Sequence, residues 1–465
     1  MIRTRHSRLA VSAAIIIVGW WLVWTWRVPI DGDQGWLLWL ARMAWRGTVV
    51  YRDLWDTNPP LSHWMLLPAG AAIEASGWPA RVVFNCYVLI WCAASLLVVA
   101  SIWRQWADAP LPQATALAAG AAVIVLLPGP FLGQREHFML VAALPWIVML
   151  GVWRSGSNST WQLEALAGTG IALAIAVKPF YIGWWILAPM LAPRVARRPA
   201  FWLVPALGMT YLAAVSTTPY PGYLRHWASL YVRYARRPWW FVAIGNPFAL
   251  LAVGAVAVTG RTAPRTPIGA ALWAATLGAW VGAVGQQKAL AYHYYCADAL
   301  ALLLLVWTSD ATRRRIALPV GVAWAAYVVW FALVGSEAER DAAAALARTV
   351  GPDSVMVLTP TADHAWLLNT EFGRPWLSTH YDLWWLAISR GRDTVPGLPH
   401  WREQDEVLRQ SLLTPKLPNV LLLARREVDV LAYLEQSPRW RAALADYRPA
   451  TVVAGYEVWR RTARH

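Results

Sequence analysis

Long apolar runs alternate with short polar segments over the first two thirds of the chain. After a tail that carries three arginines, an apolar run extends from Leu9 to Trp26 without a small-residue cleavage site, which is typical of a retained signal anchor. Ten further runs predict spans near residues 81–103, 113–128, 137–153, 162–177, 179–193, 200–216, 241–260, 267–285, 289–308 and 316–334. The pattern therefore predicts about eleven membrane spans.

Two stretches between the first and second spans predict helices that do not cross the membrane. Residues 34–46 alternate apolar and polar positions and are rich in Trp and Leu, which predicts an amphipathic helix lying in the membrane interface. Residues 61–73, opened by Pro59-Pro60, predict a second interfacial or re-entrant helix. Both helices belong to a predicted outer loop, residues 28–80.

The last 130 residues change pattern and mix short strands with helices. Strands are expected at 354–359, 419–423 and 451–460, and helices at 402–412 and 428–435. The sequence therefore predicts a mainly α fold, a polytopic membrane helical bundle followed by a small C-terminal α/β extracytoplasmic domain. The predicted domains are residues 1–335 and 336–465.

The composition supports a membrane protein. The chain is 58% hydrophobic and only 14% charged, whereas a soluble domain averages about 25% charged residues. The 34 Trp residues suit membrane interfaces, where an amphipathic ring is stable. Cys86, Cys92 and Cys296 lie in apolar segments and show no disulfide or zinc spacing.

The net charge of +15 is uneven along the chain. Residues 337–465 carry 16 basic and 16 acidic side chains, so the whole excess lies in residues 1–336. No nucleic-acid-binding motif accompanies it, which favours anionic lipid and phosphate as partners. With the N-terminus inside, arginines concentrate on short cytoplasmic loops. An odd number of spans then places the C-terminal domain outside a plasma membrane.

Acidic residues directly follow the first span, where carboxylates are costly and need a reason. Asp31 and Asp33 precede the predicted amphipathic helix. The order along this loop is Asp33-Gln34, Ala41-Arg42-x-Ala44, Gly47, Tyr51 and Pro59-Pro60-Leu61-x-x-Trp64. This order resembles the first outer loop of the GT-C glycosyltransferases, in particular their aminoarabinose transferase and protein O-mannosyltransferase branches.

The resemblance implies an enzyme that moves a sugar from a polyprenyl phosphate to a hydroxyl of a glycan, lipid or protein, with inversion. The family has Asp-Glu where this chain has Asp33-Gln34, and the aspartate is taken as catalytic. Asp31, two residues earlier, is a second candidate. A carboxylate suits the general base that takes the acceptor's proton. The alternative for both acids is a solvated loop position or a helix N-cap.

A polar run, Gly133 to His137, marks the outer end of the fourth span. Arg135 is a candidate for binding phosphate. Glu136 and His137 are candidates for binding sugar hydroxyls or a divalent ion, although two adjacent ligands do not make a metal site. The alternative is an interface cap in which Arg135 pairs with Glu136. No cofactor is required by the sequence, and metal dependence stays open.

Lys178 and Lys288 are the only lysines in the membrane part, and each lies at a predicted outer end of a span. A lysine is a compact charge suited to phosphate, and interfacial snorkelling is the alternative. Tyr292-His293 resembles a donor-pocket element of polyprenyl-sugar transferases, which implies that His293 binds phosphate or sugar. Asp298 lies deeper in the same span, where we expect a lysine or arginine partner.

Two outer segments complete the candidates. The basic, aromatic segment 217–241, with Arg233, predicts a helix that guides a lipid headgroup, covers the site or simply lies in the interface. In the tail, Asp363-His364 and the run from Ser378 to Asp382, which includes His380, suggest acceptor contact rather than catalysis. A flippase and a non-catalytic scaffold are the rival functions, but the chain shows no internal repeat of the kind transporters often carry.

Overall fold

The computed structural model describes residues 19–308 except 26, 31 and 108, and residues 337–462 except 361–363, 381, 384, 387–400, 414–416, 426 and 427. Between these ranges it describes five single positions, 319, 323, 326, 330 and 334. The chain forms two compact units. The first contains residues 1–28, 84–217 and 236–333, and the second contains 29–83, 218–235 and 334–465.

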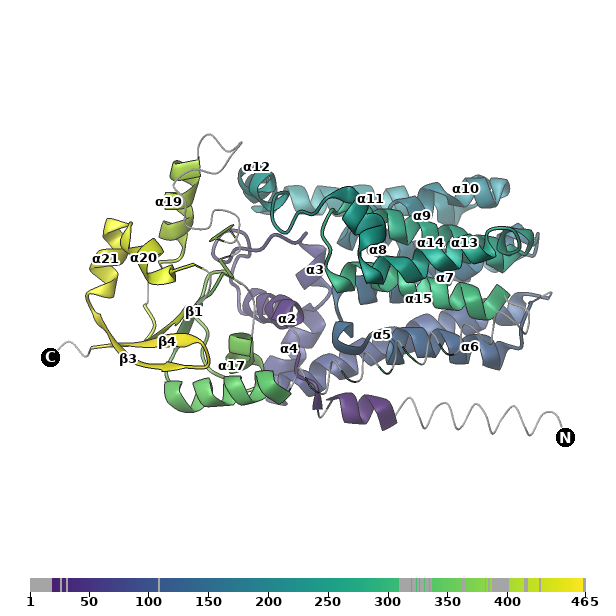
Figure 1. The fold of residues 1–465 in the computed structure, drawn as a ribbon. Coiled ribbons are helices and arrows are strands. Elements are labelled where there is room, and N and C mark those ends of the chain that lie inside the picture. The colour runs from purple at the N-terminus through teal and green to yellow at the C-terminus, as the bar shows by residue number, and fades with distance from the viewer. Residues whose placement is uncertain are drawn as a thin grey trace. The chain divides into compact units, whose positions relative to one another are not determined.

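The first unit is helical. Its helices are α5 (Ala80–Gln105, whose first turn belongs to the second unit), α6 (Gln113–Ala121), α7 (Arg135–Arg154), α8 (Trp161–Val177), α9 (Gly183–Ile186), α10 (Ala188–Leu191), α11 (Pro199–Ser216), α13 (Pro247–Thr259), α14 (Pro267–Gly285) and α15 (Ala291–Thr308). In Figure 1 these helices form one bundle. α7 is buried along its whole span and packs against α8, α14 and α15.

The span prediction is confirmed in kind but not in number. Four described helices, α5, α7, α11 and α14, are long and apolar enough to cross a membrane. Five shorter apolar helical stretches lie where spans are predicted, at residues 113–126, 161–177, 179–191, 247–259 and 291–307. The break at Lys178-Pro179 is present, because Pro179 cannot continue α8. Most of the first predicted span and the span at 316–334 lie outside the described residues.

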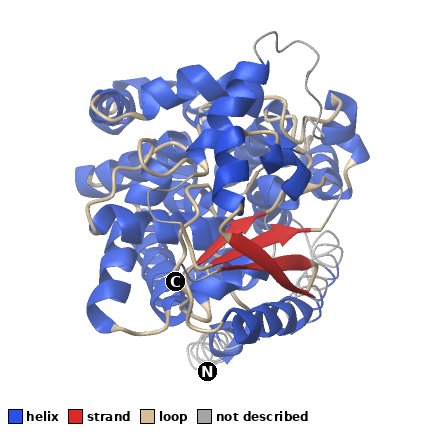
Figure 2. Ribbon diagram, turned by 90° about the vertical axis from the view of Figure 1, so that its left-hand side faces the viewer, coloured by secondary structure: helices blue, strands red, loops and turns tan. Residues whose placement is uncertain are grey.

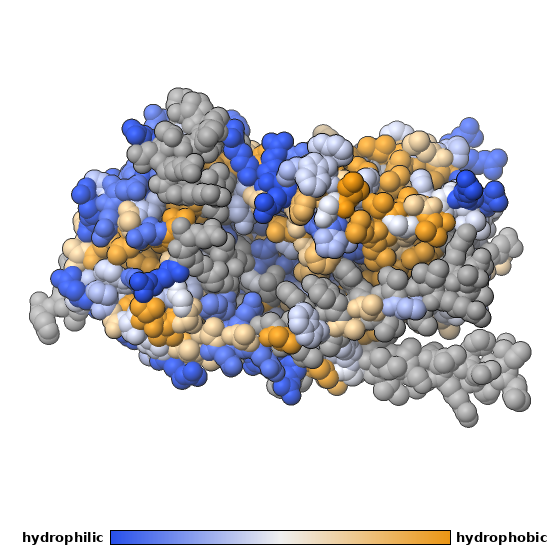
Figure 3. Space-filling view, in the orientation of Figure 1, coloured by the Kyte–Doolittle hydropathy of each residue, from blue (hydrophilic) through white to orange (hydrophobic). Residues whose placement is uncertain are grey.

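Apolar side chains face outward on the helical unit, as lipid contact requires. Figure 3 shows hydrophobic atoms gathered over these helices. Large exposed apolar residues include Ile90 and Leu97 on α5, Met209 and Leu212 on α11, and Leu250 and Val258 on α13. Burying such patches in hydrocarbon removes them from water. The chain is therefore a membrane protein.

The second unit joins the first outer loop, the segment 218–235 and the tail. It is larger than the predicted domain 336–465, because contacts in space rather than chain order define it. The predicted amphipathic helix is α2 (Gly32–Trp45), and Gly47, at φ +91°, ends it. The predicted helix 61–73 is instead two helices, α3 (Leu61–Trp64) and α4 (Leu67–Ser76). Pro68 lacks the N–H that a continuous helix would need.

Helices α2 and α4 pack closely and share an ion-paired edge. Glu74 on α4 pairs with Arg42, at 2.6 Å from Nε, and with Arg46. A Cβ on Gly70 would lie 3.0 Å from the backbone nitrogen of Arg42, so a glycine allows this approach. The outer loop is thus a packed element in which α4 holds the C-terminal end of α2.

The tail contains one four-stranded sheet in the order β1-β2-β4-β3, drawn in red in Figure 2. Strands β1 (Val355–Leu358) and β2 (Val420–Ala424) are parallel and fully buried, and both were predicted. The single strand expected at 451–460 is wrong. It is a hairpin of β3 (Tyr447–Val453) and β4 (Tyr456–Arg461), because Ala454 and Gly455 adopt φ +49° and +82° and reverse the chain.

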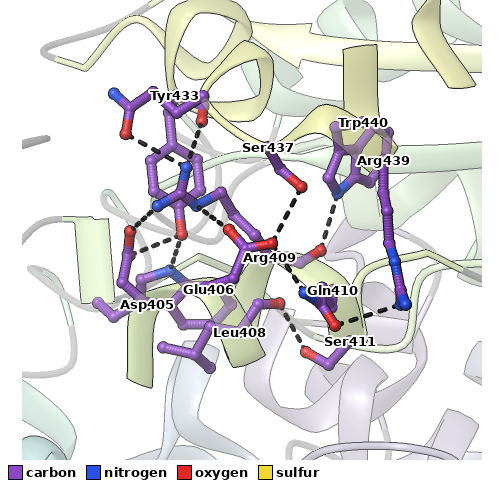
Figure 4. A network of polar contacts seen from close by, with 12 residues as sticks. Asp405, Glu406, Leu408, Arg409, Gln410, Ser411, Tyr433, Ser437, Arg439 and Trp440 are labelled. Carbon is purple, nitrogen blue, oxygen red and sulfur yellow. Dashed lines mark hydrogen bonds and ion pairs between the residues drawn. The ribbon is translucent and has the colours of Figure 1, made fainter. Parts of the chain in front are cut away.

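The remaining tail elements are η7 (His364–Trp366), α17 (Leu367–Thr370), α19 (Trp401–Ser411), α20 (Val430–Glu435) and α21 (Pro438–Leu444). The predicted helices at 402–412 and 428–435 are confirmed as α19 and α20. Their contact centres on a buried polar network (Figure 4) in which Arg409 pairs with Asp405 and lies 4.8 Å from the ring centre of Tyr433. The Tyr433 hydroxyl donates to Asp405 at 2.8 Å, so the buried charge is compensated.

Candidate functional site

A buried polar site forms in the first unit where α7 begins. Gln134 is extended, α7 starts at Arg135, and the side chains of Arg135, Glu136 and His137 are 7%, 0% and 0% exposed. The sequence predicts these residues at an outer interface, whereas the structure buries them among helices. Charged groups buried this deeply need partners.

Glu136 receives partners from two distant helices. The Lys178 ammonium, at the end of α8, pairs with Glu136 Oε1, and His293 Nε2 on α15 lies 3.6 Å from the same oxygen. Lys178 also donates to Gln286 Oε1 at 3.0 Å. Glu136 therefore has a lysine partner, whereas the alternative interpretation of the sequence paired it with Arg135. Glu136, Lys178 and His293, predicted separately from sequence, therefore lie together.

Lys178 and Lys288 occupy the ends of broken helices. Lys178 is extended, at φ −143°, between α8 and Pro179, so its side chain leaves the helix axis. Lys288 precedes α15 and follows Gln287, whose φ is +52°. The Gln287 carbonyl accepts the Arg237 N–H at 2.8 Å, which fixes this strained turn. Strained positions of this kind cluster at functional sites.

The cluster has excess positive charge. Arg135, Lys178 and Lys288 are each at least nine-tenths buried and all act electrostatically on His293. Glu136 is the one carboxylate among these five side chains. Coulomb energies are large in a medium of low dielectric constant, so a bound anion with two negative charges would balance the group. We name these residues, Arg135, Glu136, Lys178, Lys288 and His293, the cationic site.

His137 does not belong to the cationic site, and its ring contacts backbone groups instead. Its Nδ1 accepts the Gly133 N–H at 3.1 Å, and its Nε2 lies 2.7 Å from the carbonyl oxygen of Ile124. Gly133 has φ +81°, and a Cβ there would collide with Phe84. His137 therefore holds the turn before α7, and both ring nitrogens are engaged. This observation favours a structural role over the predicted sugar or metal contact.

Among the residues that the structure describes, no three His, Cys, Asp or Glu side chains gather in a way that could hold a metal ion. Asp298, expected to pair with a lysine or arginine, shows no hydrogen-bond partner for either carboxyl oxygen within the described part of the chain, although it is 1% exposed. The expected lysine or arginine partner is therefore not found among the described residues.

Asp33 belongs to the second unit. It lies in the first turn of α2, half-buried, where the N-terminal end of the helix dipole favours a carboxylate. Gln34, which stands in place of the family's usual acid, is buried. Asp31 lies outside the described residues. One turn after Asp33, the Trp36 indole donates to the buried Asp56 carboxylate at 3.3 Å.

Asp33 and Asp382 both act electrostatically on Tyr234, a residue that the sequence did not single out. Burial, then the nearby carboxylates of Asp382 and Asp33, raises the pKa of the Tyr234 phenol above its usual value. Tyr234 follows α12 (Tyr220–Tyr231), and Asp382 comes from the tail. No motif surrounds Tyr234, so the sequence did not select it. The two carboxylates that act on it electrostatically lie about 150 and 200 positions away in the chain.

The predicted helix in segment 217–241 is α12, and it packs through aromatic rings. Tyr220 and Tyr223 lie 4.8 and 5.6 Å from Tyr51, and Trp227 lies 5.6 Å from Trp55, between ring centres. Within the second unit, α12 is thus attached to the first outer loop. Arg233, just after the helix, is exposed.

The tail run from Ser378 to Asp382 also contacts the outer loop. The Trp55 N–H donates to the Thr379 carbonyl at 2.8 Å, and the rings of Trp55 and His380 stack at 5.4 Å. His380 is buried, and burial lowers its pKa to about 3. Asp363 lies outside the described residues, and His364 bonds the Ala454 carbonyl at 3.1 Å.

His380 makes the second unit sensitive to acid. Because its pKa is about 3 when folded and about 6.5 ordinarily, protonation favours the unfolded chain. The stabilisation is complete above pH 6.5 and is lost as the pH falls from 6.5 toward 3. At pH 5 we expect a loss of about 2 kcal/mol from this group. His380→Gln should remove this pH-dependent loss of stability. The melting temperature of the variant should therefore fall less than that of wild type between pH 7.5 and 5.

The matched control is already in the chain. Burial also lowers the pKa of His63 to about 3, and His63 is present in both proteins, so the comparison isolates His380. Equal pH dependence of wild type and His380→Gln would show that His380 is not held neutral in the folded protein.

No protein-family model and no curated protein matches this chain. Among solved structures, it is similar to ArnT from Cupriavidus metallidurans bound to undecaprenyl phosphate, with a TM-score of 0.60 and 12% identity over 98% of both chains. The apo form of that ArnT gives a TM-score of 0.56 and 13% identity, covering 99% of this chain and 98% of the other. The chain therefore has the fold of ArnT over nearly its whole length, as the resemblance in the first outer loop predicts.

Proposed function

We propose that the chain is a membrane glycosyltransferase that moves a sugar from a polyprenyl phosphate to a hydroxyl acceptor on the outer face, with inversion. The cationic site carries this proposal: three buried cations act electrostatically on His293, and one carboxylate, Glu136, pairs with Lys178. The ArnT structure with the same fold was solved with undecaprenyl phosphate, and the same class of lipid headgroup would supply the anion here.

In the proposed reaction the acceptor oxygen attacks the anomeric carbon and displaces the lipid phosphate in one step. Asp33 takes the acceptor's proton as the new C–O bond forms. The bond between the anomeric carbon and the phosphate oxygen breaks, and its electron pair leaves with the phosphate. Fixed cations stabilise that developing charge without rearranging at the moment of reaction.

The five members of the cationic site would divide this work. Arg135 offers a planar, two-pronged contact to phosphate, whereas Lys178 and Lys288 offer compact charges. Glu136 and His293 would hold Lys178 in position through the contacts already described. Arg233, which is exposed on the second unit, would guide the anionic lipid headgroup by its charge. His137 would act only by shaping the turn before α7.

We place the protein in the plasma membrane as a multi-pass chain with a cytoplasmic N-terminus and the tail outside. The distribution of arginines supports this orientation. The functional division at residues 335–336 stays part of the proposal, with the outer loop 28–80 assigned to catalysis.

The test is transfer by purified protein in nanodiscs, using a panel of labelled polyprenyl-phosphate pentoses and hexoses. We expect one donor to release its sugar to an acceptor and to leave polyprenyl phosphate. Movement of labelled lipid across liposomes without cleavage of any donor would overturn the enzyme and favour a flippase. Binding of donors with neither cleavage nor transport would favour a scaffold.

A further inference from the structure

A short π-helix, η1 (Ala122–Leu126), precedes the polar run that opens α7. The Leu127 N–H donates to the first carbonyl of η1 at 2.9 Å, one residue earlier than an α-helix would bond it. The Val123 carbonyl therefore loses its usual donor. The Ile124 carbonyl also lacks its usual donor, because Pro128 has no N–H. Buried carbonyls need partners, and π-helices often mark functional sites.

A second π-helix, η5 (Phe241–Gly245), has the same feature later in the chain. Pro247 has no N–H to give to the Ala243 carbonyl. The Trp280 indole replaces that donor at 3.2 Å, as the His137 ring does for η1. In both π-helices a side chain thus completes the backbone hydrogen bonding that a proline interrupts.

Two consecutive tyrosines of α15 bond a second carbonyl in each π-helix. The Tyr295 hydroxyl donates to the Val123 carbonyl at 2.6 Å, and the Tyr294 hydroxyl donates to the Val242 carbonyl at 2.6 Å. Both tyrosine side chains are buried. We name Tyr294 and Tyr295 the tyrosine pair. It attaches the first turn of α15 to two helices that are far apart in the chain.

The tyrosine pair directly follows His293 of the cationic site, and further hydrogen bonds fix the same turn. The Tyr181 hydroxyl donates to the His293 carbonyl at 3.0 Å, and the Cys296 thiol donates to the Glu136 carbonyl at 3.0 Å. His293 Nε2 lies 3.6 Å from Glu136 Oε1. Helix ends otherwise fray, whereas residues 293–296 of α15 are each held by a neighbouring segment.

We propose that the tyrosine pair positions His293 in the cationic site, so that the phosphate of the polyprenyl donor meets a correctly placed Lys178. The two hydroxyls hold α15 from two helices, which sets the place of the His293 ring relative to Glu136. Glu136 in turn pairs with Lys178. The tyrosine pair acts through His293 and does not touch the phosphate. This inference rests on the proposed function of the cationic site.

The test is binding of undecaprenyl phosphate to the full chain in nanodiscs, with the melting temperature of each variant. Tyr294→Phe and Tyr295→Phe keep the ring and each remove one hydrogen bond. We expect the Kd to rise about tenfold in each, the scale of one lost hydrogen bond. Trp280→Phe is the matched control, because it also removes a hydrogen bond to η5. Its melting temperature should fall similarly, while its Kd should stay at the wild-type value.

A double-variant cycle separates positioning from packing. In a His293→Gln background, neither tyrosine variant should weaken binding further, because residues that act through one another are not additive. Equal weakening with and without His293 would overturn the inference and leave the enzyme assignment in place. Weakening by Trp280→Phe as large as that by the tyrosine variants would do the same, since general loss of packing would then explain both.

A different result identifies failure of the proposed function. If wild type does not bind undecaprenyl phosphate, the function proposed for the cationic site is wrong. Nitrogen NMR of protein labelled in its histidine rings then decides the inference by itself. The signal that His293→Gln removes should shift in Tyr294→Phe and Tyr295→Phe but not in Trp280→Phe. An unchanged His293 signal in both tyrosine variants would refute the positioning role.

Discussion

Replacing Asp33 by asparagine is expected to lower the kcat of sugar transfer by about 100- to 10,000-fold, the range that a general base contributes. The amide is nearly isosteric with the carboxylate but cannot take the acceptor's proton. Asp33 is half-buried in the first turn of α2 and does not belong to the cationic site. Binding of the polyprenyl-phosphate donor should therefore persist. The measurement is single-turnover transfer together with donor binding by the same purified variant.

Asp53 provides the matched control, because it is an acid of the same outer loop but is paired with Arg52 at 2.8 Å and more exposed. Asp53→Asn should transfer sugar at the wild-type rate. Full activity of Asp33→Asn would remove Asp33 as the base and direct the same test to Asp31. Loss of donor binding in Asp33→Asn would mean that this residue acts before the chemical step.

Replacing Lys178 by methionine should produce the second large effect, this time on stability as well as on donor binding. The change leaves the fully buried carboxylate of Glu136 without its ammonium partner. Breaking a buried pair by removing one member costs about 3–5 kcal/mol. We therefore expect a clearly lower melting temperature and little stabilisation by added undecaprenyl phosphate, since a ligand stabilises only the fold that binds it.

A double variant separates charge pairing from ligand binding. Lys178→Met with Glu136→Gln removes both charges, so most of the stability should return, whereas stabilisation by undecaprenyl phosphate should stay weak. Arg104→Met is the control, because Arg104 is exposed at the end of α5 and bonds only a nearby serine among its described contacts. If the double variant regains full ligand stabilisation, Lys178 is a structural partner of Glu136 and not a phosphate ligand.

Sequence reasoning was most successful where the signal is local. The apolar runs predicted helices that the structure confirms, and the period of residues 34–46 predicted α2. The break at Lys178-Pro179 followed from the missing N–H of proline. The strand prediction failed at Ala454-Gly455. These two residues adopt positive φ values that reverse the chain, so one predicted strand is a hairpin.

The predicted site residues show the same division. Arg135, Glu136 and His137 were selected because charge is costly near hydrocarbon. Lys178 and Lys288 were selected because a lysine suits phosphate, and His293 through the family resemblance. The structure groups all of these except His137, whose ring nitrogens are occupied by backbone groups. The sequence around His137 does not distinguish it from a ligand-binding histidine, because neighbouring residues in the chain do not show which groups the ring will contact.

The sequence by itself determined that this is a helical membrane protein with a C-terminal α/β tail, because hydrophobic period and composition act locally along the chain. Only the tertiary structure decided which charges share one site. It showed that Glu136 lies beside Lys178 and His293. These partners come from other helices, Lys178 being 42 positions away in the chain, so only helix packing brings them within reach.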